Sequence, residues 1–313
     1  MKRVIRLLVK KLRVQYLQKL IGNTPVVELK RVRTGRIFVK LEYMNPTGSH
    51  KDRTAYYMIK DAMDKGKLCD GGLVVEASSG NTAISVAWIS SIMNLKTFFC
   101  VEEDISPCTL SMLESLGAKV AKMKKRPPSD PGHYLNVADR IARERGGVFL
   151  NQFTNEANVR AHYETTAREL YGQVGGKVDA FVMGVGTGGT ISGVGKFLRE
   201  KLGQKVKIIG VVPKGSPVTL GESSIGEPIP GLATMTVSEI YKRHKDIVDN
   251  VVEVSSKEAL KAMKEMIKHE GIMGGPSTGA NINVALKISE ELGKDAVIAT
   301  LACDSVFRYT HLL

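Results

Sequence analysis

The stretch "RIFVKLEYMNPTGSHKDRTAYYMIKDAMDKGK" (Arg36–Lys67) contains a strand pattern, a polar loop and a helix pattern, in that order. Ile, Phe, Val, Leu and Tyr dominate Arg36–Met44, and such residues favour a strand. The following Pro-Thr-Gly-Ser segment is typical of a loop. Tyr56–Lys67 has apolar residues three and four positions apart, as on one face of a helix. The stretch therefore predicts one strand–loop–helix unit of an α/β fold.

The same order recurs along most of the chain. Alternating strands and helices predict mainly parallel, twisted sheets covered by helices. No internal repeat or low-complexity segment interrupts the alternation. Further predicted strands are residues 72–77, 96–102, 118–123, 179–185, 207–213, 248–255 and 295–303. Predicted helices are residues 81–93, 109–116, 134–145, 157–171, 190–202, 256–269 and 279–292.

The length and the charge of the chain limit the possible functions. A chain of 313 residues favours about two domains, and no apolar run reaches the ~18 residues of a membrane helix. The net charge is +13, and residues 1–20 are basic without a single acid. Such an arm could bind nucleic acid or an acidic membrane. Because it has no nucleic-acid motif and its Val and Leu residues suit an amphipathic helix packed on the body or on a partner subunit, we expect neither partner.

The cysteines give no sign of a metal site or of a disulfide framework. Cys69, Cys100, Cys108 and Cys303 are scattered, without a C-x-x-C pair or a histidine at ligand spacing. The basic arm also lacks the apolar core and the cleavage site of a secretory signal. We therefore expect free thiols, a cytoplasmic protein and no bound metal.

One loop between a predicted strand and a predicted helix is unusually polar. It lies in "EASSGNTAISVAW" (Glu76–Trp88). Hydroxyls, an amide and backbone N–H groups at a helix N-terminus suit a carboxylate or a phosphate. The alternative is an ordinary N-cap, which needs only one Ser or Asn. The residues of this loop are Ser78, Ser79, Gly80, Asn81 and Thr82.

A second loop, "MGVGTGGTISGVG" (Met183–Gly195), contains the pattern G-x-G-x-x-G. That pattern can mark a dinucleotide site, provided that an acid follows about 20 residues later at the end of the next strand. Here the next predicted strand ends in Pro213-Lys214, so the acid is missing. The hydroxyls of Thr187 and Thr190 instead suit a compact monophosphate, held by N–H groups and a helix dipole.

A third loop and one lysine complete the pattern. "MGGPSTGANI" (Met273–Ile282) precedes a helix, and Ser277 or Thr278 could be its N-cap. Lys51 stands at the start of another predicted helix, where the dipole disfavours a cation and favours a neutral amine. A lysine amine, a phosphate loop and a carboxylate loop together suggest pyridoxal phosphate, whose aldehyde condenses with a lysine.

Five motifs in order resemble the cysteine synthase and cystathionine β-synthase family of pyridoxal-phosphate enzymes, the fold type II group. The resemblance covers Ile21–Tyr309, nearly the whole chain, and implies two α/β lobes like those of the tryptophan synthase β subunit. The motifs are "NPTGSHKDRT", "EASSGNTA", "NQFTNEANVRAHYETTARE", "GVGTGGTISG" and "GGPSTGAN".

The resemblance implies a role for each site residue. Lys51 would form the Schiff base with the cofactor and act as acid and base. Asn81 would bind the 3′-oxygen of the cofactor, and Ser277 would face its pyridine nitrogen. The residues implied for the phosphate are Gly186, Thr187, Gly188, Gly189 and Thr190. The residues implied for the substrate carboxylate are Ser78, Ser79, Gly80, Thr82 and Gln152.

The implied reaction is β-replacement. L-Cysteine would form from an activated serine, O-acetyl-L-serine above all, and sulfide, by way of an α-aminoacrylate. A serine facing the pyridine nitrogen makes the ring a weaker electron sink than an aspartate would, which suits loss of a β leaving group. Alternatives are an O-phosphoserine sulfhydrylase, a cystathionine β-synthase using serine and homocysteine, a threonine synthase and a serine/threonine dehydratase. A nicotinamide oxidoreductase is not expected, because this chain lacks the acid that would bind the ribose of the dinucleotide. A relative without catalytic activity is not expected either, because it would not need Lys51.

The resemblance also implies a domain organisation and a homodimer. The larger, cofactor-anchoring domain would comprise residues 1–44 and 156–313, with residues 1–20 as the basic arm. The smaller domain, residues 45–155, would close over the substrate. Two departures stand out. His50 replaces the small residue that usually precedes the lysine, and it could titrate, pack or face solvent. Residues 221–235, which should face the leaving group, lack the arginine that O-phosphoserine users tend to have there.

Overall fold

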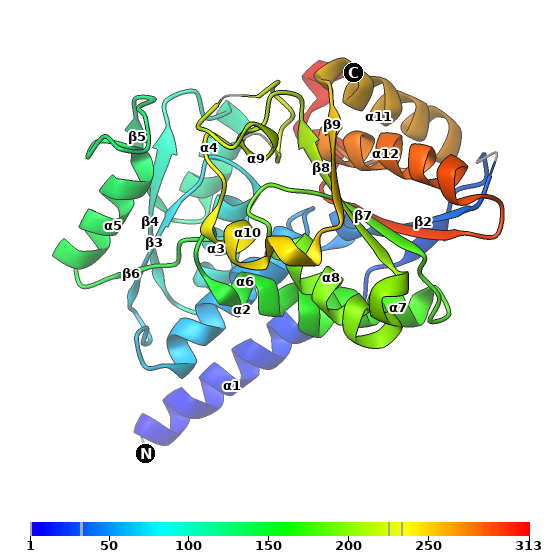
Figure 1. Ribbon diagram of the computed structural model, residues 1–313. Helices are drawn as coiled ribbons and strands as arrows, with labels where there is room; N and C mark the ends of the chain where they lie inside the picture. Colours follow the sequence, from blue (N-terminus) through cyan, green and yellow to red (C-terminus); the bar gives the residue numbers. More distant parts are fainter. Residues whose placement is uncertain (1, 32–33, 225, 233) are drawn as a thin grey trace. The chain divides into compact units, whose positions relative to one another are not determined.

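The computed structural model describes residues 2–31, 34–224, 226–232 and 234–313, with the backbone alone for residues 2–8 and 10. It is an α/β protein with two sheets (Figure 1), so the predicted fold class is confirmed. Two compact units divide the chain. Unit 1 comprises Met1–Gly22, Asn45–Thr47 and Lys51–Ala157. Unit 2 comprises Asn23–Met44, Gly48–His50 and Asn158–Leu313.

Unit 1 is built on a parallel four-stranded sheet in the order β5-β4-β3-β6. Alternate residues of β4 pack on opposite faces, Phe99 beneath α2 and α3 and Phe98 beneath α5. The strands are β3 (Leu73–Ala77), β4 (Lys96–Glu102), β5 (Lys119–Met123) and β6 (Val148–Phe149). The helices are α1 (Lys2–Leu20), α2 (Lys51–Asp64), α3 (Asn81–Ile92), α4 (Pro107–Ser115) and α5 (Tyr134–Glu144).

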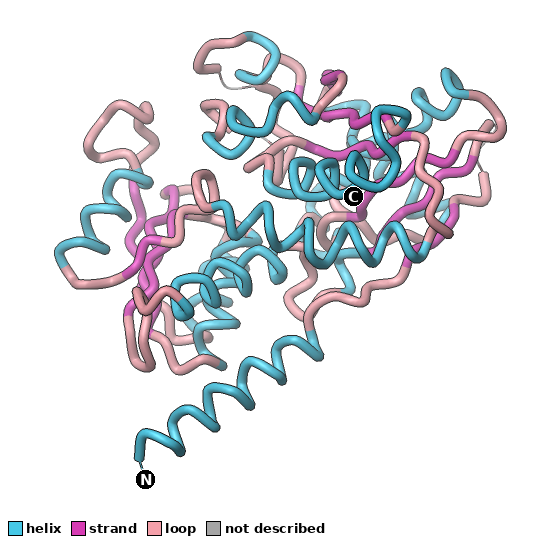
Figure 2. Tube along the Cα trace, turned by 60° about the horizontal axis from the view of Figure 1, so that its bottom comes forward, coloured by secondary structure: helices cyan, strands magenta, loops and turns pink. Residues whose placement is uncertain are grey.

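Unit 2 contains a six-stranded sheet in the order β1-β2-β10-β7-β8-β9, parallel except for the β1–β2 pair. One face packs on α11 and α12 and the other on α7 and α8, as labelled in Figure 1, and Figure 2 shows helices and strands in a second view. The strands are β1 (Val26–Glu28), β2 (Arg36–Leu41), β7 (Ala180–Gly184), β8 (Lys207–Pro213), β9 (Asn250–Val254) and β10 (Val297–Ala302). The helices are α7 (Ala167–Gln173), α8 (Gly189–Leu202), α9 (Pro217–Leu220), α10 (Glu239–His244), α11 (Ser256–Glu270) and α12 (Pro276–Leu292), and α6 (Glu156–Ala161) joins the two units.

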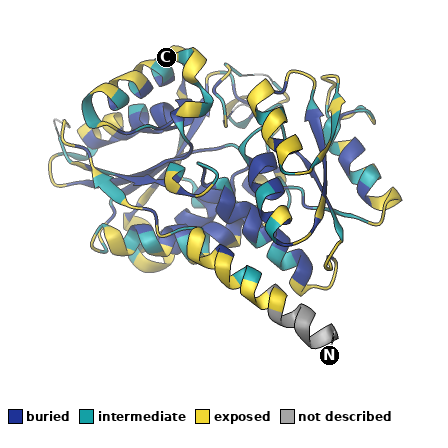
Figure 3. Ribbon diagram, turned by 180° about the vertical axis from the view of Figure 1, so that it is seen from behind, coloured by how far each residue is buried: buried dark blue, intermediate teal, exposed yellow. Residues whose placement is uncertain are grey.

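The N-terminal helix belongs to unit 1, which differs from the predicted boundary that placed residues 1–44 in the larger domain. The physical reason is its packing, since Leu17 is fully buried in the core with α2 and α3. The helix thus packs on the body, while Leu12 and Tyr16 are 64% and 55% exposed (Figure 3).

Most predicted elements appear within two or three residues of the expected ends. Two short strands, β1 and β6, were not predicted. The helix predicted at residues 157–171 is α6, a π-helical turn (His162–Thr166) and α7. The strand predicted for Arg36–Met44 ends at Leu41 in a 3-10 turn.

Within the described residues, no helix is both long and apolar enough to cross a membrane. In the same part of the chain no group of three or more His, Cys, Asp or Glu side chains could hold a metal ion. All four cysteines are free thiols, and Cys100 and Cys303 are buried.

Candidate active site

Lys51 is the first residue of α2, and the loop before it is held in place by hydrogen bonds. The N–H and the hydroxyl of Thr47 donate to the carboxylate of Asp52, at 2.8 and 2.5 Å. Asp52 is fully buried, and an acid in the first turn suits the positive end of the helix dipole. The Thr47 hydroxyl also lies 3.2 Å from the hydroxyl of Ser85 in α3. These contacts hold the loop before Lys51 against α3, and the Lys51 side chain is partly buried.

The polar loop between β3 and α3 is not an ordinary N-cap. Gly80 occupies the N-cap position of α3, and no side chain caps the helix. Ser79 instead uses its hydroxyl to accept the N–H of Glu102, at 2.8 Å. The loop therefore presents the start of α3 and its backbone amides without a competing side-chain cap, as a carboxylate-binding loop requires.

Thr82 and Gln152 meet although 70 positions separate them. The Thr82 hydroxyl donates to Oε1 of Gln152 at 2.7 Å, and both side chains are buried. Asn151, the residue before Gln152, has a φ of 48° in the left-handed region. The structure thus brings together two of the residues predicted to bind the substrate carboxylate.

The glycine loop between β7 and α8 is shaped by close packing. Gly188 has a φ of 81° and forms the N-cap of α8 without a side-chain cap. A Cβ on Gly186 would lie 2.8 Å from the carbonyl oxygen of Gly231, and a Cβ on Gly189 would lie 2.2 Å from Oδ1 of Asn158. Glycine is therefore required here, and the backbone N–H groups stand at the positive end of α8.

Two buried hydroxyls complete this loop. Nδ2 of Asn158 donates to the Thr187 hydroxyl at 3.0 Å. Nε2 of His162 lies 3.2 Å from the hydroxyl of Thr190. Sequence reasoning missed the roles of Asn158 and His162, although both lie in a quoted motif and both are polar residues in a predicted helix. Both are almost fully buried, so they orient the two threonines.

Ser277 is buried in the first turn of α12. The N-cap of this helix is Gly275, and no side chain caps it, so the alternative of Ser277 or Thr278 as N-cap is wrong. A Cβ on Gly231 would lie 3.7 Å from Oγ of Ser277. Because Gly231 also approaches Gly186, it lies between the glycine loop and Ser277.

His50 packs inside unit 2 and does not face solvent. Its Nδ1 lies 3.0 Å from the carbonyl oxygen of Cys303, and its ring centroid is 5.7 Å from that of His162. The residue before Lys51 is thus anchored to the end of β10.

These residues fit pyridoxal phosphate. The glycine loop offers a compact set of amides and two hydroxyls with no acid, as a monophosphate needs. β8 ends at Pro213, and no acid follows it to hold the ribose of a dinucleotide. Unit 1 contains Lys51, Ser78, Ser79, Gly80, Asn81, Thr82 and Gln152, and unit 2 contains Gly186, Thr187, Gly188, Gly189, Thr190 and Ser277.

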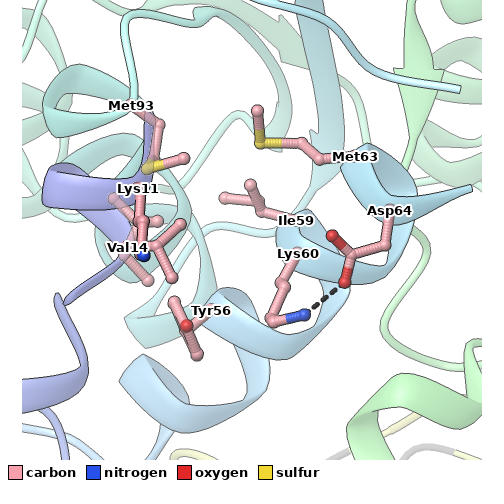
Figure 4. Close-up of a pocket in the computed structure, with 9 residues that line it drawn as sticks. Lys11, Val14, Tyr56, Ile59, Lys60, Met63, Asp64 and Met93 are labelled. Atoms are coloured by element: carbon pink, nitrogen blue, oxygen red, sulfur yellow. Dashed lines mark hydrogen bonds and ion pairs between the residues drawn. The ribbon is translucent and has the colours of Figure 1, made fainter. Parts of the chain in front are cut away.

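A separate hollow of about 210 Å³ lies among α1, α2 and α3 (Figure 4). Its walls are mainly apolar, and Lys11, Lys60 and Asp64 line its edge. Lys60 forms an ion pair with Asp64. No predicted site residue lines this hollow, so it is not part of the candidate site.

The comparisons with known proteins agree with this geometry. The family described as "Pyridoxal-phosphate dependent enzyme" matches residues 17–304. "Cysteine synthase 1" of Neurospora crassa is 37% identical, over 94% of this chain and 81% of that protein. "Cysteine synthase B" of Campylobacter jejuni is 37% identical, over 93% and 95%. The crystal structure of O-ureido-L-serine synthase has a TM-score of 0.88 at 32% identity, over 95% and 94% of the two chains. The chain therefore belongs to the family of pyridoxal-phosphate dependent enzymes.

Proposed function

We propose that this enzyme makes L-cysteine by β-replacement from O-acetyl-L-serine and sulfide. The observation that carries the proposal is the buried hydrogen bond between Thr82 and Gln152. It joins the polar loop to Gln152, a substrate-binding residue that the resemblance to cysteine synthases implies and that a threonine synthase would not require. Relatives named cysteine synthase, similar over most of their length, support it.

The glycine loop would hold the cofactor. The amides of residues 186–190 stand at the positive end of α8 and favour a phosphate dianion. Thr187 and Thr190 would donate to its oxygens, because Asn158 and His162 fix their orientation. The bound cofactor supplies an electron sink that stabilises negative charge at the substrate Cα.

Lys51 would be the catalytic residue. Its amine stands at the start of α2, where the helix dipole disfavours a charged ammonium. It would attach the cofactor, then remove the Cα proton of the substrate and later return a proton. Thr47 and Asp52 hold the loop that carries it.

Two further side chains would direct the reaction. Asn81, at the first position of α3, would bind the 3′-oxygen of the cofactor. Ser277 would face the pyridine nitrogen. A hydroxyl cannot keep that nitrogen protonated as a carboxylate does, so the electron sink is weak. A weak sink favours departure of a β leaving group over transamination.

The substrate carboxylate would bind at the start of α3. A carboxylate placed there receives backbone N–H groups and the positive helix end. This grip leaves the β carbon free to exchange acetate for sulfide. The residues that would bind it are Ser78, Ser79, Gly80, Thr82 and Gln152.

The segment of residues 221–235 supports a donor whose ester group is uncharged, as in O-acetyl-L-serine, over one with a phosphoryl group. It contains no arginine to bind a phosphoryl group, although Ile225 and Ala233 lie outside the described residues. Its Leu232 packs closely on Gly184, and Gly231 on Gly186. O-Acetyl-L-serine is therefore favoured over O-phosphoserine.

We also propose a cytoplasmic homodimer. Free thiols suit a reducing compartment. The exposed apolar residues Val9, Leu12, Tyr16 and Leu20 of α1 could contribute to the contact between subunits. Light scattering of the purified protein tests the dimer, and a monomer at all concentrations would contradict it.

Borohydride reduction tests the role of Lys51. The cofactor should become fixed to Lys51 and be found on its peptide by mass spectrometry. Lys51→Ala should abolish the labelled peptide. Lys60→Ala, which replaces a partly exposed lysine of the same helix, should leave it unchanged. A label on any other lysine of the wild type would contradict the assignment.

A panel of donors tests the reaction. O-Acetyl-L-serine with sulfide should give cysteine faster than O-phosphoserine, or than serine with homocysteine. Pyruvate as the main product would indicate a dehydratase. Threonine from O-phosphohomoserine would indicate a threonine synthase.

A further inference from the structure

Glu76 is a fully buried carboxyl that the proposed reaction does not use. It is the penultimate residue of β3, and only Ala77 separates it from the polar loop. On the basis of the proposed function, we propose that Glu76 is a positioning residue. It ties the polar loop to Gln152, and by staying neutral it permits the substrate carboxylate to bind.

The carboxyl lies where two chain segments leave the sheet. Its Oε1 accepts the N–H of Ala77 at 3.0 Å. The backbone N–H groups of Asn151 and Gln152, which follow β6, also favour the charged form of this carboxyl and lower its pKa. The N–H of Leu150 donates to the carbonyl of Val75 at 3.0 Å and holds the two segments side by side. Glu76 therefore contacts both segments that carry the proposed carboxylate-binding residues.

The environment of Glu76 favours the neutral acid. Among the described residues, its Oε2 accepts no hydrogen bond of normal geometry. Burial raises the pKa of Glu76 to about 8, and the N–H groups of Ala77, Gln152 and Asn151 lower it without compensating. No charged side chain is among the causes of this shift. Burial without a neighbouring cation therefore favours the protonated carboxyl at neutral pH.

The titratable groups that interact with Glu76 do not offer it a positive charge. Burial raises the pKa of Cys100 in β4 to about 11, and a negative charge on Glu76 would raise it further. Tyr134 of α5 also has a raised pKa, first through burial and then through the charges of Glu102 and Glu76. The positive charge of Arg140 lowers the pKa of Cys100, and Arg140 is not among the causes of the pKa shift of Glu76. At neutral pH all three groups, Glu76, Cys100 and Tyr134, are uncharged.

Ionisation of Glu76 would oppose substrate binding. Above pH 8 a negative charge would stand behind a loop that must accept a second carboxylate, with little solvent to screen it. Binding of the substrate should then require Glu76 to take up a proton. If only the protein with a neutral Glu76 binds the donor, the KM for the donor rises tenfold per pH unit above the pKa of Glu76, while kcat is little affected.

Steady-state kinetics of Glu76→Gln test this inference. Gln keeps the shape and cannot ionise. Between pH 6.5 and 9.5, the ratio of the wild-type KM to the Glu76→Gln KM should be flat below pH 8 and rise several-fold above it. Titration of the donor amine affects both proteins and cancels in the ratio. Glu103→Gln, at an exposed residue in the same unit, should follow the wild type. A constant ratio would overturn the inference.

A second measurement needs no variant and no turnover. Propionate has a carboxylate but no amine, and its binding to the wild-type holoenzyme can be followed by calorimetry in buffers of different ionisation enthalpy. Near pH 8.5 binding should take up a proton, and at pH 6.5 it should not. Binding without proton uptake at pH 8.5 would overturn the inference. If the enzyme shows no sulfhydrylase activity, the proposed function fails, yet this measurement still tests Glu76.

Discussion

Replacing Gly189 by Ala should damage the phosphate loop, and the structure gives the size of the effect. The new Cβ would lie 2.2 to 2.6 Å from three atoms of the Asn158 side chain. Asn158 is 1% exposed and donates to Thr187, so it cannot move without losing that bond. Overpacking costs about 1–3 kcal/mol, and the lost buried hydrogen bond about 1 kcal/mol or more. We expect a loss of about 2–4 kcal/mol.

The assay is urea unfolding of the cofactor-free protein, together with the dissociation constant of pyridoxal phosphate. Gly189→Ala should unfold at lower urea and bind the cofactor at least tenfold more weakly. Gly172→Ala is the matched control, because Gly172 lies in α7 with nothing within 4 Å of the new Cβ. That variant should be more stable by about 0.5–1 kcal/mol. If both variants unfold at or above the wild-type midpoint, the reasoning about the loop is refuted.

Three further predictions concern single side chains. The folded-state pKa of Glu76, about 8, lies above its ordinary value of 4.5, so its stabilising contribution is present in acid and is lost as pH rises from about 4.5 to 8. The loss is up to about 5 kcal/mol, and urea midpoints at pH 5 and 8.5 should differ less in Glu76→Gln than in the wild type. Lys40 is fully buried and pairs with Glu169 at 2.8 Å, so Lys40→Met should cost about 3 kcal/mol or more, and Lys40→Met with Glu169→Leu should recover part of that loss in thermal melts. Ser255→Ala removes the capping box of α11 and should cost about 1 kcal/mol of stability. Carboxyl NMR should show the pKa of Glu258 rising from about 2 toward its usual value of 4.5. An unchanged pKa would contradict the role of the cap.

The main elements of the fold could be predicted because their periodicity extends over many residues. β4 and β8 occupy the predicted residues. β6 has two residues and β1 three, too few for a period-2 pattern to be recognised. The π-helical turn after Ala161 adds one residue to a turn, and the segments on either side of it are too short for the shift in the apolar pattern to be recognised.

The site was partly predictable for a related reason. The glycine loop and the polar loop are composed of residues whose chemistry is visible locally. Asn158 and Glu76 could not be identified from the sequence, because their roles depend on what packs against them from distant segments. Likewise, α1 belongs to unit 1 because Leu17 packs in the core with α2 and α3, and the sequence alone does not show this tertiary contact. Closure of the smaller domain over the substrate stays a prediction.

The central claim is a double displacement in which acetate leaves before sulfide attacks. The most direct test is a rapid-quench experiment with the holoenzyme and O-acetyl-L-serine alone, followed by sulfide. We expect about one acetate per subunit to be released at once without sulfide, no pyruvate in that burst, and about one cysteine per subunit when sulfide is added. The Lys51→Ala variant should give no burst. Acetate released only after sulfide is present would contradict the proposed reaction.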